Sequence, residues 1–231
     1  MTLQFQKRTV AVTVVVLAVI AGLNGAIGVA GAQEAPEKKT DGFTISRANL
    51  AQSATFTVTQ TIAPKGGNPL VRSYKVEIKG EKARLDYSDQ MVGEVRYLAN
   101  DKGVFLYIPV NKNAMKQSFK GGVDGALKLA FAQVRERMAT AKKIGEEKVG
   151  GIPTTVYLDS KTGGKVYIGN KTGFRLPVKT ILTNEGGVTS LEVKNIKLNV
   201  SLDDSRFALP AGTKIIESEN GSPPGGIPVG R

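Results

Sequence analysis

Apolar and polar residues alternate with a period of two along most of this chain, and this pattern constrains the fold more than any other feature. Successive side chains of a β-strand point to opposite faces of the sheet, so the alternation predicts strands with one buried and one solvated face. In the first run Phe56, Val58 and Ile62 share one parity, and a row of threonines occupies the other. Short runs of this kind, separated by glycine-rich turns, predict an antiparallel meander, sandwich or barrel.

Further strands are expected wherever the same alternation returns. In the last run Leu191 and Val193 share one parity, whereas Ile196 and Leu198 share the other. A one-residue β-bulge near Asn195 would restore a single apolar face, so we expect one there. The runs after the first one are 73–79, 82–88, 94–99, 104–109, 142–149, 154–160, 165–169, 178–183 and 190–202, which is the last run.

One run is apolar at both parities. Residues 103–109 read Gly-Val-Phe-Leu-Tyr-Ile-Pro, without a polar face. This pattern predicts a strand that is buried on both sides, either as an ordinary central core strand or with a helix or ligand on one flank.

Two segments have helical spacing instead. Between 125 and 143, apolar residues recur every three or four positions, Asp124 is a suitable N-cap, and Gly145 follows the end. A shorter helix is expected at 45–52. The apolar face of the longer helix comprises Leu127, Ala130, Phe131, Val134 and Met138.

The two ends of the chain differ in composition from its middle. Residues 1–32 have a basic start, an apolar run from Thr9 to Ala21 and a closing Ala30-Gly31-Ala32, which is the pattern of a cleaved signal peptide. A retained membrane anchor at 9–32 is the alternative. Residues 33–42 are expected to be a polar spacer, 43–217 the folded domain, and 218–231 a disordered tail rich in proline and glycine.

The residue inventory disfavours an enzyme. The chain has no histidine and no cysteine, so the commonest general base, thiol nucleophiles, disulfides and thiolate metal sites are excluded. Neither a nucleophile elbow nor a phosphate-binding glycine loop is present, and we expect no cofactor and no metal. The net charge of +12 would suit nucleic acid or an anionic membrane, but export disfavours nucleic acid.

Four segments, in order, resemble motifs of the outer-membrane lipoprotein carrier (LolA-type) family. Residues 84–87, Arg-Leu-Asp-Tyr, are similar to the family's Arg-Trp-Asp/Glu-Tyr signature, with Leu85 in the place of the tryptophan. Residues 100–109 resemble its hairpin ending in Tyr-x-Pro, and 166–168 with 174–179 resemble its strand pair containing Leu-Pro. Residues 202–214 resemble its closing phrase around Phe207 and Pro210.

The resemblance implies an α+β, mainly β fold: an unclosed antiparallel β half-barrel covered by one or two helices. In the family the cleft receives the acyl chains of lipoproteins, and the strand arginine latches the helical lid. Arg84 is the matching residue, and the alternative for it is a surface ion pair with Asp86 or Glu81. The residues expected to line the cleft are Phe56, Val58, Tyr74, Val76, Leu85, Tyr97, Phe105 and Tyr107.

Two functions follow from this resemblance. The first is a periplasmic carrier that binds lipoprotein acyl chains or lipid and meets partner proteins at the inner and outer membranes. The second is an envelope sensor or interaction module that uses the same cleft. In both cases we expect a monomer that binds no nucleic acid, and no catalytic residues.

Overall fold

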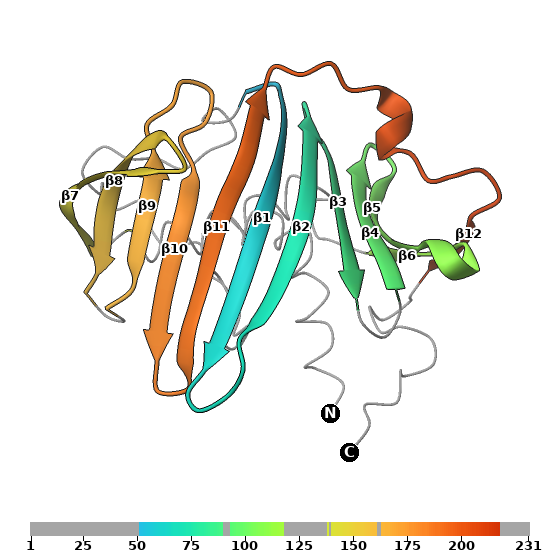
Figure 1. The fold of residues 1–231 in the computed structure, drawn as a ribbon. Coiled ribbons are helices and arrows are strands. Elements are labelled where there is room, and N and C mark those ends of the chain that lie inside the picture. Colours follow the sequence, from blue (N-terminus) through green and yellow to red (C-terminus); the bar gives the residue numbers. More distant parts are fainter. Residues whose placement is uncertain (1–50, 90–92, 118–137, 139, 161–162, 218–231) are drawn as a thin grey trace.

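The structure is a computed structural model that describes residues 51–89, 93–117, 138, 140–160 and 163–217. The described strands form one 12-stranded sheet in the order β12-β6-β5-β4-β3-β2-β1-β11-β10-β9-β8-β7, and the sheet curves across its width (Figure 1). The strands are β1 (Ser53–Pro64), β2 (Leu70–Lys79), β3 (Lys82–Asp89), β4 (Gly93–Asn100), β5 (Gly103–Ile108), β6 (Asn113–Gln117), β7 (Ala141–Val149), β8 (Ile152–Asp159), β9 (Lys165–Gly169), β10 (Pro177–Asn184), β11 (Gly187–Leu198) and β12 (Lys214–Glu217).

The sheet is unclosed, as expected, but it is mixed and not wholly antiparallel. β7 and β12 are its two edges, and β12 pairs parallel with β6. After β11 the chain passes over the sheet through the short 3-10 helix η3 (Asp204–Phe207) and reaches β6 in the same direction (Figure 1). A second 3-10 turn, η2 (Pro109–Asn111), joins β5 to β6. The expectation of a purely antiparallel sheet is therefore wrong at this edge.

The alternation predicted ten of the twelve described strands and the bulge, but it missed β6 and β12. Thr55 and Thr57 pair with Lys197 and Lys194, so β11 has one extra residue opposite β1. Asn195 has the positive φ of 56° that such an irregularity uses, and β11 ends at Leu198, earlier than the expected 202. The predicted bulge is confirmed, and it keeps both halves of β11 facing the same core.

The helical cover expected from the sequence is not supported. The described residues contain no α-helix of seven or more residues, and Ala51 and Gln52 are not helical. The expected segment 125–143 falls largely outside the described residues, and its end belongs to β7, where Ala141 pairs with Asp159. At 141–143 the backbone pairs with β8, and this tertiary contact overrides the local helical spacing.

The concave face of the sheet carries the larger core. Phe56, Val76 and Leu85 belong to one buried cluster, which extends through Leu191 and Val178 to the strands at the far side. β5 is buried on both sides, as predicted, because Val104 and Phe105 point to opposite faces and are both buried. Phe105 is buried on the convex side, where η3 and Phe207 cover the sheet.

Gly187 lies at the hairpin between β10 and β11, where its backbone packs closely against the end of β1. A Cβ built on Gly187 would clash with the backbone carbonyl oxygen of Ala63, and the residue has φ of +139°. We expect Gly187→Ala to lower the free energy of unfolding by about 1–2 kcal/mol. The loss is not larger because the ends of the strands can shift to relieve the clash. Urea denaturation measures the effect. The matched control is Gly66→Ala, where φ is +81° but no atom lies within 4 Å; equal losses in the two variants would show that the contact with Ala63 contributes nothing.

Candidate functional site

A continuous apolar row crosses four neighbouring strands on the concave face. Phe56 on β1 lies opposite Val76 on β2, and Val76 lies opposite Leu85 on β3. Leu85 in turn lies opposite Tyr97 on β4. Directly paired residues point to the same face, so these four side chains form one surface. Val58 and Tyr74 pair in the next row, so six of the eight residues expected in the cleft share this face.

The β9–β10 loop closes one end of the concave face. Phe174 is buried and meets Phe56 edge to face, with ring centroids 5.7 Å apart. Leu176 is buried beside it, and Ala51 donates a backbone hydrogen bond of 2.7 Å to Gly173. The first strand and a loop more than a hundred residues later in the chain therefore meet at this end of the sheet.

Three tyrosines give the apolar face polar atoms. The rings of Tyr74 and Tyr87 lie 5.5 Å apart, and those of Tyr87 and Tyr97 stack at 6.1 Å. The hydroxyl of Tyr74 donates to Oε1 of Gln60 at 2.9 Å. Burial raises the pKa of all three phenols above the ordinary value. They therefore remain neutral and keep a hydroxyl proton at physiological pH.

The other two residues expected in the cleft face the opposite way. Phe105 pairs with Leu98, and Tyr107 pairs with Arg96, whose guanidinium carbon lies 5.8 Å from the Tyr107 ring centroid. Leu98 pairs with Arg84, so all of these side chains lie on the convex face. The structure therefore does not bring Phe105 and Tyr107 together with Phe56 and Tyr97.

The longer helix expected at 125–143 would be the lid over the cleft, and of its apolar face only Met138 is described. It is buried in the cluster that contains Phe56 and Val76. Leu127, Ala130, Phe131 and Val134 lie outside the described residues.

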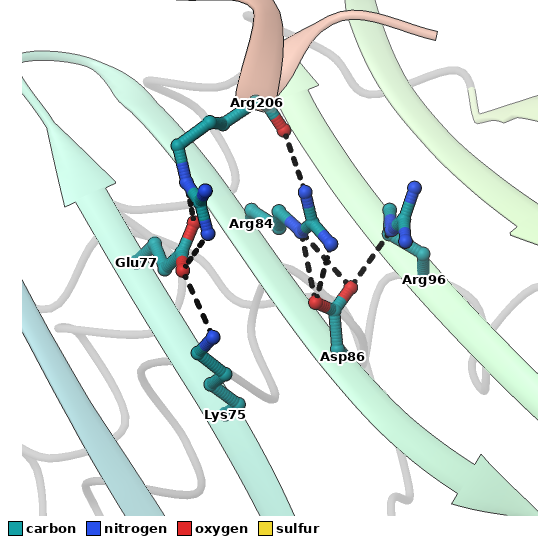
Figure 2. Close-up of polar contacts among 6 residues, drawn as sticks. All are labelled: Lys75, Glu77, Arg84, Asp86, Arg96 and Arg206. Atoms are coloured by element: carbon teal, nitrogen blue, oxygen red, sulfur yellow. Dashed lines mark hydrogen bonds and ion pairs between the residues drawn. The ribbon is translucent and has the colours of Figure 1, made fainter. Parts of the chain in front are cut away.

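Arg84 forms the ion pair that was the alternative to a latch. Its Nε donates to Oδ2 of Asp86 at 2.8 Å, and its Nη1 reaches the carbonyl oxygen of Arg206 at 3.4 Å (Figure 2). Arg96 completes the group with a 2.9 Å contact to Asp86. Arg84 thus joins the convex face to η3, and its expected helical partner lies outside the described residues.

A buried ion pair on this convex face was not predicted. The side chain of Glu77 is only 2% exposed, and Nε of Arg206 donates to its Oε2 at 2.7 Å (Figure 2). Burial alone would raise the pKa of Glu77, but the hydrogen bonds and charge of Arg206, helped by Lys75 and Arg84, hold it below the ordinary value. The alternation predicts that Glu77 lies on the solvated face, and no local feature of the sequence shows that η3 covers it.

Two cavities flank η3 on the convex side. One, of about 470 Å³, has Phe105, Phe207 and Ile215 in its lining, with lysines around it. The other, of about 820 Å³, is bounded by the β2–β3 turn and the segment that follows β11. Asp204 in the lining of both is held by Lys79 and Lys82 at 2.8 and 3.0 Å. The described residues contain no group of three or more acidic side chains that could hold a metal ion.

The fold and this face define a class: proteins built on one large unclosed β-sheet with an apolar concave side. No protein-family model matches the sequence, and no curated protein matches it. An uncharacterized conserved protein from Thermus thermophilus is similar at 14% identity and a TM-score of 0.49, over 74% of this chain and 93% of its own. A LolA superfamily protein from Nitrosomonas europaea is similar at 12% identity and a TM-score of 0.37, over 70% of this chain and 92% of its own.

A third similar structure is the Pseudomonas aeruginosa MucA/MucB complex, at 14% identity and a TM-score of 0.46, covering 73% of this chain and 59% of that one. At such identities and scores these likenesses assign no family and transfer no function. Within the described part of the chain, no helix is both long and apolar enough to cross a membrane.

Proposed function

We propose that this chain is a non-enzymatic carrier in the bacterial cell envelope that binds the acyl chains of lipoproteins or lipids on its concave face. The observation that carries the proposal is the unbroken apolar row Phe56–Val76–Leu85–Tyr97, backed by the larger buried cluster of the same face. The signal-like segment 1–32 supports export. The resemblance of four sequence motifs to those of lipoprotein carriers supports the class of ligand.

The energetics suit a reversible carrier. Each buried methylene contributes about 0.8 kcal/mol, so a chain of roughly 14 methylenes contributes about 11 kcal/mol. Association costs on the order of 4–15 kcal/mol. One chain is therefore bound marginally, whereas two or three are bound firmly enough for transport and weakly enough for release.

The sheet provides a matched pair of variants for the test. Leu85 and Leu98 are both fully buried on adjacent strands, but they face opposite sides. Either leucine changed to phenylalanine overpacks its site and costs about 1–3 kcal/mol of stability. We expect Leu85→Phe to lose most bound lipid because the larger ring occupies the concave face, and Leu98→Phe to keep it.

The measurement is native mass spectrometry of the protein purified gently from an envelope extract, followed by lipid extraction and identification. Co-purified lipid or acylated peptide that disappears only in Leu85→Phe supports the carrier. A clean unliganded mass, unchanged after incubation with acylated peptides and phospholipids, would overturn it and favour an envelope interaction module.

A further inference from the structure

One buried side chain on the concave face has an unsatisfied polar atom. Thr180 on β10 is 1% exposed, and its hydroxyl has no hydrogen-bond partner among the residues that the structure describes. A buried hydroxyl without a partner lowers stability, and a valine of the same shape would avoid this cost. Buried polar groups are normally paired, so this one points to a partner outside the protein chain.

Thr180 belongs to a polar row across the concave face. It pairs with Leu191, Leu191 pairs with Gln60, and Gln60 pairs with Arg72. All four residues therefore point to the same side as the apolar cluster. Neighbouring strands lie about 4.8 Å apart, so Gln60 is about two strand spacings from Thr180 and one from Arg72.

Arg72 reaches over this face toward the tyrosines. Tyr74 follows it on the same parity of β2, and its hydroxyl donates to Gln60. The charge of Arg72 and its hydrogen bond to Tyr74 oppose the rise that burial causes in the pKa of that phenol. Arg72 itself is exposed, so a fixed cation stands at the outer end of a row of neutral hydrogen-bonding groups.

The two ends of the face differ in polarity. Phe56 lies four residues before Gln60 along β1, and there Phe174 closes the apolar end. At the other end, near the β1–β2 hairpin, Leu70 and Val71 are exposed beside Arg72. An amphiphile placed on this face with its chains toward Phe174 would have its polar group at the row.

We propose that Arg72 and Gln60 bind the phosphate, and Thr180 an ester oxygen, of an anionic lipid whose acyl chains lie along the apolar row; this rests on the proposed function. The planar guanidinium of Arg72 pairs with phosphate oxygens through two parallel hydrogen bonds. The amide of Gln60 donates to another phosphate oxygen, and the hydroxyl of Thr180, two strand spacings further, donates to an ester oxygen next to the acyl chains.

The sharpest variant is Thr180→Val, which removes one oxygen and keeps the shape. We expect phosphatidylglycerol to bind about five- to tenfold more weakly, because one hydrogen bond is lost. Stability without lipid is expected to be unchanged or higher, because the unpaired hydroxyl is gone. A purely structural threonine would give the opposite pattern, with stability lowered and affinity kept. Thr57→Val, on the other face of β1, is the matched control.

Arg72→Gln tests the charge with two probes that have the same acyl chains. We expect affinity for phosphatidylglycerol to fall about tenfold and affinity for diacylglycerol to change less than twofold. The control is Arg175→Gln in the β9–β10 loop, at the opposite end of the face. Titration by native mass spectrometry provides all of these affinities.

The outcomes separate this proposal from the broader one. If both probes bind wild type equally and neither Thr180→Val nor Arg72→Gln alters affinity, the headgroup site is overturned while acyl-chain binding stands; a water bridging Thr180 would give this result. If neither probe binds wild type, the carrier function fails as well.

Discussion

Replacement of Arg206 by methionine is expected to destabilise the protein by about 2–3 kcal/mol. Removing one partner of a buried ion pair leaves an uncompensated charge, which costs about 3–5 kcal/mol when the pair is fully buried. Glu77 is 2% exposed but Arg206 is 38% exposed, so solvent reduces the cost. Glu77 also retains Lys75, whose Nζ lies 3.4 Å from Oε1. Urea denaturation at neutral pH measures the loss.

A double-mutant cycle shows whether the loss comes from this pair. Glu77→Gln removes the charge and keeps the shape, so Arg206→Met in that background should cost much less than in wild type. Equal costs in the two backgrounds would contradict the assignment and would attribute the effect to packing of the arginine stem against the sheet.

The same pair gives a pH dependence with a definite sign. The pKa of Glu77 is lowered in the folded protein, so the unfolded chain takes up a proton first as pH falls. The pair's contribution is therefore complete above the ordinary glutamate pKa of about 4.3 and is lost as pH falls through the lower folded value. We expect the stability gap between wild type and Arg206→Met to narrow with falling pH below about 4. A gap that stays constant from neutral pH to pH 3 would contradict this.

The sequence predicts which face of the sheet a side chain takes only where apolar and polar residues alternate along the strand. In β1 and β2 the threonines and charged residues mark the solvated side, so Phe56 and Val76 could be placed together from the sequence. In β5 both parities are apolar, and the pattern contains nothing to say which face Phe105 takes. The pairing of Phe105 with Leu98 on β4 decides it, and the residue pattern of β5 alone does not contain this register.

Contacts between residues far apart in the sequence explain the other two features that the sequence did not predict, the burial of Glu77 and the parallel strand β12. Glu77 is buried because Arg206, 129 positions later, crosses over it. The parallel β12 depends on the same crossing, and a four-residue strand has too few side chains to show its direction in the sequence. The bulge at Asn195 was predictable because a parity slip within a single strand is a local signal.

Truncation of Phe174 is expected to have the largest effect on stability among the changes considered. Its side chain is fully buried, and Phe→Ala substitutions in cores cost about 3–5 kcal/mol because they leave a cavity. The cost should lie toward the upper end, because Phe174 also loses an edge-to-face contact with Phe56 that contributes about 0.5–1.5 kcal/mol beyond area burial. Thermal and urea denaturation of Phe174→Ala measure it.

Pairing this change with two others tests whether the loop is anchored to the concave core. Phe56→Ala and Phe174→Ala share one contact, so the double variant should lose less stability than the sum of the two single losses. Phe207 is equally buried but is the last residue of η3, in the convex layer. Phe207→Ala and Phe174→Ala should therefore add. Strict additivity of the first pair would contradict the packing of the β9–β10 loop on Phe56, and with it the closed apolar end against which a bound chain would lie.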